Sequence, residues 1–147
     1  MNIMHKDFYA SGFLYHPRSQ QILLQQINSA NNDNVWSLLG GSNKKKENFE
    51  EAFLRIINSH LKLKLKPSFI HPVYDYFNIG KNKKIYIYYA NVSKRGKFKG
   101  KKKIFSWFTF RQIQKLPIPE QIRHDIVVGQ RVIESSIRKR LGFRTIG

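Results

Sequence analysis

The sequence predicts an α/β fold, and three observations lead to this prediction. Strand-like and helix-like segments alternate along the chain, apolar residues between positions 49 and 61 recur at helical spacing, and two glycines separate a short apolar strand from that helix. With 147 residues, of which 41% are hydrophobic, the chain has room for one domain with its own core. We therefore expect residues 1–147 to form a single domain.

The N-terminal part predicts a β-hairpin and a third strand. Residues 9–16 and 21–26 are strand-like, and residues 17–19 between them suit a turn. Residues 35–39 (VWSLL) form a short apolar strand. We expect the glycines at 40 and 41 to stop that strand, because glycine accommodates a sharp change of chain direction.

The segment after the glycines predicts one amphipathic helix that ends near Leu63. Glu47, Glu50 and Glu51 lie at its expected N-terminal end, where the helix dipole favours carboxylates. Its apolar positions have helical spacing: Phe49, Ala52, Phe53, Ile56, Ile57 and Leu61.

The C-terminal half predicts a second hairpin followed by a long helix. Residues 69–77 and 84–92 are strand-like on either side of a turn. Residues 93–103 hold seven basic residues and no acid, which is typical of an exposed loop. We expect a last strand over residues 104–108 and a short helical turn over 109–115. A long helix is expected over residues 120–141, weakened in its middle by Gly129.

The composition excludes several classes of protein. Without cysteine, the chain has no disulfide, no thiolate metal site and no cysteine nucleophile. The start of the sequence lacks the features of a secretory signal, and no stretch approaches the ~18 apolar residues of a membrane span. We therefore expect a cytoplasmic protein.

The charge balance is strongly positive. The sequence has 27 Lys and Arg against 9 Asp and Glu, a formal net charge of +18. Such a charge attracts polyanions, including nucleotides, RNA, DNA and acidic membrane surfaces. The alternative is that much of it forms a solvated surface without a partner.

The stretch GSNKKKENFEEAFLRIINSHLKL, residues 41–63, resembles the box of the Nudix (MutT-like) hydrolase superfamily. That box is a Gly, five residues, a Glu, seven residues, then Arg-Glu-aliphatic-x-Glu-Glu-x-Gly-aliphatic. The later segment FSWF resembles a Trp-Phe segment that often follows the last strand in this family. Five box positions match: Gly41, Glu47, Arg55, Ile57 and Leu63.

The resemblance implies a Nudix-fold αβα sandwich with a mixed β-sheet, and hydrolysis of a nucleoside diphosphate linked to another group. The family holds magnesium with three box carboxylates that converge on one helix face. Here those positions are Ile56, Ser59 and His60, and the family's glycine is Lys62. Because magnesium requires oxygen ligands in octahedral geometry, this set implies an impaired site and a degenerate box.

Other residues of the same segment are candidates to replace the missing ligands. Glu47, Glu51 and Arg55 are spaced four apart and share a helix face, so a displaced metal site is one interpretation. The spacing favours a structural interpretation, in which Glu51 forms an ion pair with Arg55 and the helix dipole favours acids at the N-terminal end. His60 is a candidate general base by its ordinary pKa, although a histidine at a helix end more often packs at a surface.

Two further features carry predictions of their own. Lys44, Lys45 and Lys46 lie in the box loop beside Gly41, where the resemblance places the phosphate site. Farther along, His124 and Asp125 are adjacent and point in different directions on the last helix, and we expect them to be the exposed start of that helix.

Two functions fit these residues. The first is a hydrolase that uses Mg2+ or Mn2+, with Glu47 and Glu51 as residual ligands, Arg55 orienting the helix and a nucleotide or nucleotide-sugar as substrate. The second is an inactive Nudix-fold module that binds a nucleotide or RNA through its basic surface and needs no cofactor. The sequence leaves the oligomeric state open, with a homodimer as one alternative.

Overall fold

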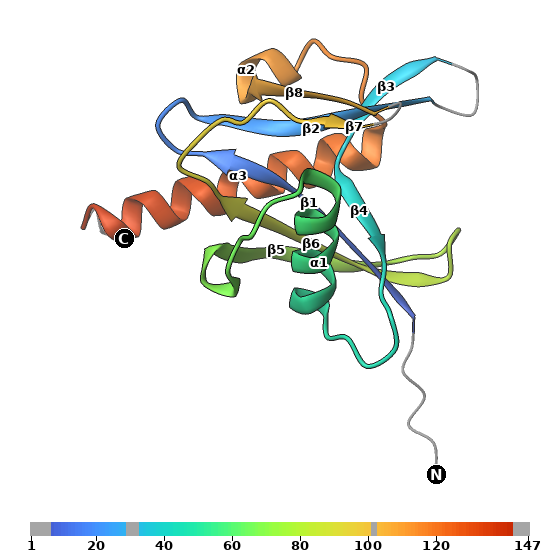
Figure 1. The fold of residues 1–147 in the computed structure, drawn as a ribbon. Helices are drawn as coiled ribbons and strands as arrows, with labels where there is room; N and C mark the ends of the chain where they lie inside the picture. Colours follow the sequence, from blue (N-terminus) through green and yellow to red (C-terminus); the bar gives the residue numbers. More distant parts are fainter. Residues whose placement is uncertain (1–6, 29–32, 101–102, 143–147) are drawn as a thin grey trace.

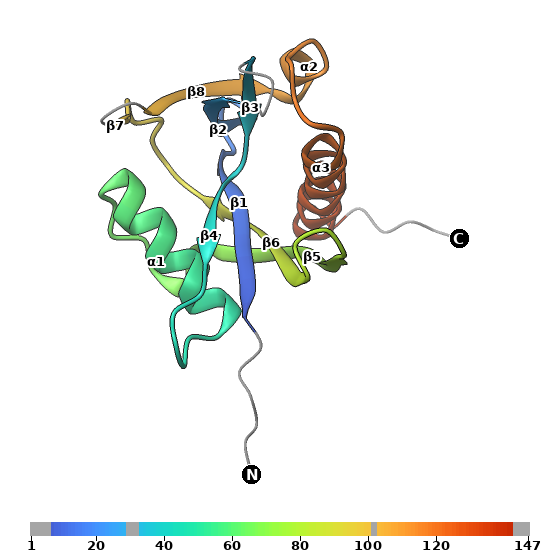
Figure 2. The same ribbon diagram turned by 90° about the vertical axis from the view of Figure 1, so that its right-hand side faces the viewer.

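A computed structural model describes residues 7–28, 33–100 and 103–142. It has one mixed β-sheet with α1 (Phe49–Leu61) on one face and α3 (Glu120–Arg140) on the other (Figures 1 and 2). This is the predicted αβα sandwich. The strands are β1 Phe8–His16, β2 Gln21–Asn28, β3 Asn34–Ser37, β4 Leu39–Ser42, β5 Ile70–Asn78, β6 Lys83–Asn91, β7 Lys99–Gly100 and β8 Lys103–Thr109, and the short helices are η1 Pro67–Phe69 and α2 Phe110–Ile113.

The central strand of the sheet is β1. The strand order is β5-β6-β1-β2-β8-β7, and β3 and β4 branch from it by pairing with β2 and β1 respectively. Strands β1 and β6 are parallel, whereas the other pairs are antiparallel. The predicted first hairpin is present, but β1 and β2 are in register only next to their turn, and β4 takes over as the neighbour of β1 from Tyr9 to Gly12.

The prediction that Gly40 and Gly41 end a strand is wrong. Both lie inside β4, paired with Ser11 and Ala10, and the chain instead breaks between β3 and β4 at Leu38. A Cβ on Gly40 would lie 2.8 Å from the Tyr9 ring, and one on Gly41 would lie 3.2 Å from Ile56 Cδ1. The glycines thus allow close packing against β4, and sequence spacing does not distinguish this role from a turn.

Two cores hold the helices to the sheet. On the α1 side, Phe53 and Ile57 are fully buried, and on the α3 side, Phe13 and Ile126 are. A Cβ on Gly129 would lie 2.9 Å from the Phe13 ring, so the glycine predicted to weaken α3 is the point where α3 approaches the sheet closely. Of the helices in the described ranges, none is long and apolar enough to cross a membrane.

The basic segment after β6 is an exposed loop with two anchor points. Trp107 Nε1 donates a hydrogen bond to Gly96 O at 3.0 Å, and Phe98 packs its half-buried ring on Phe105. The segment then enters β7, which pairs with β8. The exposed loop is therefore confirmed for residues 93–98, with Gly96 and Phe98 anchored by aromatic contacts, while residues 101–102 lie outside the described residues.

Candidate functional site

The N-terminal end of the box helix is built by a capping box. Asn48 Oδ1 accepts a hydrogen bond from Glu51 N at 2.8 Å, and Asn48 N donates to Glu51 Oε1 at 3.0 Å. These bonds satisfy backbone groups that the first helical turn leaves without partners. The predicted Glu51–Arg55 ion pair is not formed, because Glu51 turns back to cap the helix and Arg55 has a closer acid elsewhere.

That acid is Glu47, which joins the box loop to the helix. Arg55 Nε and Nη2 donate to the two Glu47 carboxylate oxygens at 2.6 and 3.0 Å, and Lys44 N donates to Glu47 Oε1 at 2.6 Å. Arg55 Nη2 also reaches Ser42 O at 2.9 Å. The hydrogen bond from Arg55 lowers the pKa of Glu47, which keeps it ionised. Both Glu47 oxygens therefore already have structural partners.

The first of the three metal positions holds hydrocarbon. Ile56 is only 2% exposed and packs against the backbone of Gly41. Ser59, the second position, is exposed and neutral. Within residues 7–28, 33–100 and 103–142, no three His, Asp or Glu side chains come close enough to hold a metal ion.

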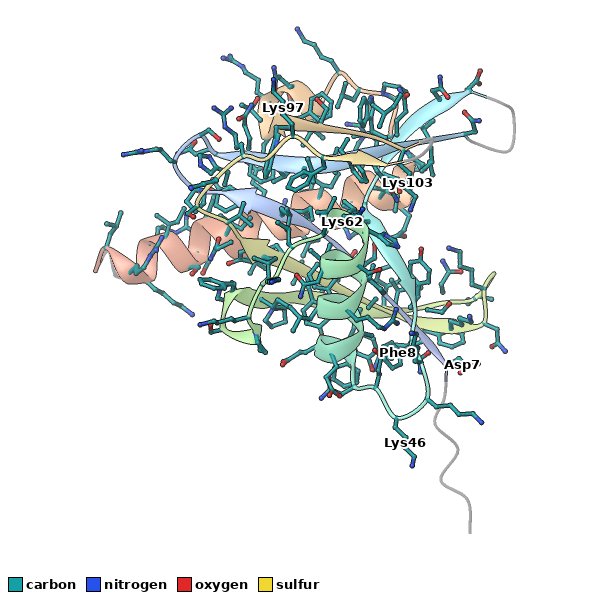
Figure 3. The ribbon with its side chains drawn as sticks, in the orientation of Figure 1. Asp7, Phe8, Lys46, Lys62, Lys97 and Lys103 are labelled. Atoms are coloured by element: carbon teal, nitrogen blue, oxygen red, sulfur yellow. The ribbon has the colours of Figure 1, made fainter. Side chains whose placement is uncertain are left out.

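His60, the third position, lies in a positive field. Its ring is half-buried, and its buried Nδ1 has no hydrogen-bond partner among the described residues. Burial lowers the pKa of His60, and the positive charges of Lys103 and Arg55 lower it further. Lys62 and Lys103 both lie at the C-terminal end of α1 (Figure 3). A histidine with a lysine and an arginine nearby thus stands at one of the positions where the family's box holds carboxylates.

The three loop lysines lie at the opposite end of α1. Lys44, Lys45 and Lys46 are exposed in the loop before the helix, and Asn43 joins this loop to the start of β1 by exchanging hydrogen bonds with Phe8. Figure 3 shows Lys46 at the far end of α1 from Lys62. The three lysines precede Phe49, the first residue of α1, whereas His60 is near its last residue, about 16 Å farther along the helix axis at ~1.5 Å per residue. The structure therefore places Gly41 and Ile56 in contact but keeps the predicted phosphate-binding lysines away from His60.

Comparison with known proteins bears on this arrangement. No protein-family model and no curated protein matches the sequence. Solved structures do match: a MutT structure from work on Aliivibrio salmonicida and Vibrio cholerae has a TM-score of 0.64 at 14% identity, over 88% of this chain and 98% of that chain. The Nudix domain of Shewanella oneidensis NrtR, complexed with ADP ribose, has a TM-score of 0.69 at 14% identity, over 89% and 90%. The chain has the Nudix fold.

A third match agrees with this assignment. A Nudix-family hydrolase from Clostridium perfringens has a TM-score of 0.64 at 17% identity, over 86% of this chain and 96% of that chain. At such identities the likeness establishes the fold. The residues at the box positions then decide what this version of the Nudix fold can do.

Asp125 is a buried carboxylate on the sheet-facing side of α3. The prediction that it belongs to an exposed helix start is wrong. Asp125 is fully buried and accepts hydrogen bonds from Tyr74 OH at 2.5 Å, Tyr76 OH at 3.2 Å and Gln121 Nε2 at 3.0 Å. His124, next to it, is exposed as expected. Helical periodicity does not reveal the contact, because the two tyrosines belong to β5, about fifty residues earlier.

The burial of Asp125 predicts a pH dependence of stability. Burial raises the pKa of Asp125 above its ordinary value of 3.8, against the effect of its three hydrogen bonds. Between 3.8 and this raised pKa the folded protein binds more protons than the unfolded chain, so this contribution to stability falls as the pH rises. The measurement is the free energy of unfolding in urea of the wild type and of Asp125→Asn at a series of pH values. We expect the wild-type value minus the Asp125→Asn value to fall as the pH is raised from about 4.

The Asp125→Asn reference in that experiment cancels the opposite contribution of Glu47, whose pKa is lowered. A difference that rises with pH would contradict the prediction. It would mean that the hydrogen bonds to the carboxylate outweigh its burial.

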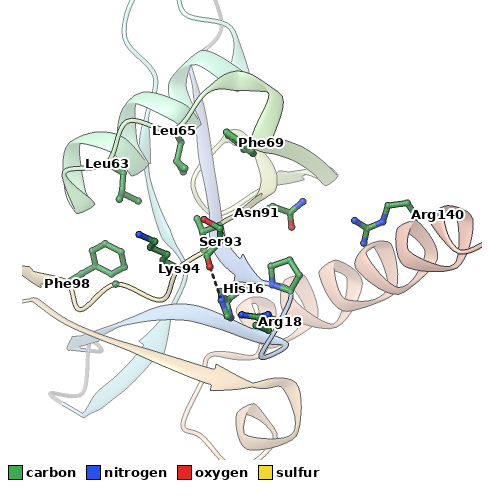
Figure 4. Close-up of a pocket in the computed structure, with 13 residues that line it drawn as sticks. His16, Arg18, Leu63, Leu65, Phe69, Asn91, Ser93, Lys94, Phe98 and Arg140 are labelled. Atoms are coloured by element: carbon green, nitrogen blue, oxygen red, sulfur yellow. Dashed lines mark hydrogen bonds between the residues drawn. The ribbon is translucent and has the colours of Figure 1, made fainter.

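A cavity of about 770 Å³ opens where β1 and β6 end (Figure 4). Its wall comes from the β1–β2 turn, the chain after α1, the chain after β6 and the end of α3. Sequence spacing does not reveal it, because these segments are far apart in the chain. Two of its cations, Lys94 and Arg140, belong to basic runs that are visible in the sequence.

Proposed function

We propose that this chain is a binding module that holds the phosphates of a nucleotide derivative on the box-helix face without a divalent metal. One observation supports this most directly: the three expected carboxylates are absent from that face, and Lys103 near it has no salt-bridge partner among the described residues. The three carboxylate positions hold Ile56, Ser59 and His60, and the charges that act on His60 are the cations Lys103 and Arg55. A cationic face attracts phosphate directly and repels Mg2+.

The two acids proposed as residual metal ligands are already engaged. Glu47 accepts hydrogen bonds from Arg55 and from the backbone of Lys44, and Glu51 caps α1. A metal that recruited either carboxylate would compete with these bonds. The NrtR domain with the same fold is complexed with ADP ribose, which supports a nucleotide derivative as the ligand class.

In this proposal the lysines of the box loop bind a ligand only when it is longer than a diphosphate. A diphosphate is held near Lys103, because Lys44–Lys46 precede the other end of α1. A longer polyanion such as RNA can contact both groups through successive phosphates. The proposal therefore includes Gly41 and Lys44–Lys46 as a phosphate-binding loop only for the longer ligand.

The test is calorimetric titration of ADP-ribose in EDTA, in Mg2+ and in Mn2+, with product analysis after each titration. We expect binding of similar strength in all three buffers and no turnover. Lys103→Glu is expected to weaken binding at least about tenfold, which corresponds to ~1.4 kcal/mol. Lys139→Glu, an equal change of charge on exposed α3, is the matched control and is expected to have little effect.

Binding that requires Mg2+ or Mn2+, or equal losses in Lys103→Glu and Lys139→Glu, would contradict a metal-free site on the box face. A single-stranded RNA oligonucleotide tests the longer ligand. Its affinity should fall steeply with salt and should fall further when Lys44, Lys45 and Lys46 are replaced together by Gln.

The competing proposal is a divergent hydrolase. Glu47 and Glu51 are retained, so a substrate that carries its own Mg2+ or Mn2+ would find two carboxylates near the start of α1, with Arg55 as the orienting residue and His60 as general base. Turnover that is lost in Glu51→Gln would support it. Asn48→Ala is the control, because it breaks the same cap without removing the carboxylate.

A further inference from the structure

The cavity beyond the end of α1 is separate from the box face. Leu63 is the first residue after α1 that lines the cavity. Gly96 and Phe98 line both this cavity and a neighbouring one that contains Lys103, so this segment divides the two. Asn58 positions the first part of the wall, since its side chain bonds Leu65 N at 2.9 Å and Leu65 O at 3.2 Å. The cavity is thus held open by contacts that are independent of any ligand on the box face.

The interior of the cavity is largely hydrocarbon. Leu63, Leu65, Val92 and Phe98 are half-buried along it, and the Phe69 ring is 45% exposed. Covering such surface is favourable by about 25 cal/mol per Å². A volume of about 770 Å³ also lies within the ~300–1,000 Å³ of small-molecule sites.

Three cations from different elements stand around this apolar surface. Arg18 comes from the β1–β2 turn, Lys94 from the chain after β6 and Arg140 from the last turn of α3 (Figure 4). The lining residues include no Asp or Glu, and none of the three cations has a salt-bridge partner in the described part of the chain. Like charges around a cavity repel one another, so an anion is the complementary occupant.

Two polar side chains of the wall are held by hydrogen bonds to other parts of the protein. Ser19 N donates to His16 Nδ1 at 3.2 Å, so His16 is protonated at Nε2 and donates to Ser93 O at 3.2 Å. Asn91 is bonded to His71 at 3.2 Å. These bonds fix the His16 ring and the Asn91 amide nitrogen, and the rest of the lining offers mainly hydrocarbon and positive charge for recognition.

We propose that this cavity binds a single-chain alkyl or acyl phosphate. The chain lies along Leu63, Leu65 and Phe69, and the phosphate lies among the three cations. The guanidinium groups of Arg18 and Arg140 suit the phosphate oxygens, because arginine can donate two parallel hydrogen bonds to them.

The test uses decyl phosphate below its micelle concentration, with the full chain and heteronuclear NMR titration. We expect one-to-one binding, with shifts at residues around the cavity, and at least about tenfold weaker binding of both inorganic phosphate and decyltrimethylammonium. Arg140→Glu and Phe69→Ser change exposed side chains and should fold normally. Each is expected to weaken decyl phosphate binding at least about tenfold, whereas Lys103→Glu should leave it unchanged.

Several outcomes would overturn the proposal. Absence of binding, equal binding of the cationic amphiphile, or full affinity in both Arg140→Glu and Phe69→Ser would each do so. Displacement of decyl phosphate by ADP-ribose would show that the cavity is a nucleotide site. Because Lys103→Glu tests the box face and Arg140→Glu tests the cavity, failure of one proposal is distinguishable from failure of the other.

Discussion

Replacing Gly12 with alanine is expected to destabilise the protein by at least about 4 kcal/mol, because the added methyl group has no room between β6 and α1. A Cβ at this position would lie 1.9 Å from Tyr88 O in the paired strand β6 and 2.9 Å from the Phe53 ring of α1. The first clash is with backbone, which cannot move without breaking the β1–β6 ladder. Since domains are stable by only ~5–15 kcal/mol, much of the folded population should be lost.

The measurement is the midpoint of urea unfolding, together with the yield of soluble protein. Gly80→Ala is the matched control, because the added Cβ would meet only Asn78 Oδ1 at an ordinary 3.5 Å. It is expected to change stability by less than about 0.5 kcal/mol. A Gly12→Ala protein as stable as Gly80→Ala would show that β1, β6 and α1 pack less closely than the structure has them.

The second large effect is expected at Asp125. Asp125→Ala would leave the Tyr74 and Tyr76 hydroxyls and the Gln121 amide without their shared acceptor, at a cost of about 2–4 kcal/mol. The network joins α3 to β5, so its loss should also increase amide hydrogen exchange in both elements. Urea unfolding and hydrogen exchange of the two proteins measure this.

Two variants control for the chemistry of that change. Asp125→Asn keeps an acceptor oxygen and the shape of the side chain, and is expected to recover more than half of the lost stability. Asp75→Ala removes the same atoms from an exposed residue whose bridge to Lys84 is 3.4 Å long, and should cost no more than ~1 kcal/mol. Equal losses at Asp75 and Asp125 would contradict a role for the buried network.

Much of the fold is predictable because its signals are local. The spacing of Phe53, Ile56 and Ile57 predicts α1, and the structure has that helix within two residues of its expected end. The second hairpin, the last strand and α3 are also confirmed, since each follows from periodicity or from turn residues within its own segment. The β4 glycines are the exception, because sequence alone does not separate a turn from close packing against a neighbouring strand or helix.

The candidate site is predictable only in part. The absence of carboxylates at Ile56, Ser59 and His60 is a property of the sequence itself, and it follows from aligning one motif. The partners of the remaining charged residues do not follow from the sequence. Arg55 pairs with Glu47, eight residues away, and not with Glu51, the partner that helical spacing predicts.

By itself, the sequence determined the α/β class and the excess of positive charge, and it predicted a box helix without its acidic positions. Only the tertiary structure decided which charges act together: Lys103 with His60, Asp125 with Tyr74, and three distant cations around one apolar cavity. The physical reason is that periodicity records which face of an element is apolar, whereas the order of strands in the sheet sets which elements meet. Contacts between residues as far apart as Tyr74 and Asp125 depend on that order.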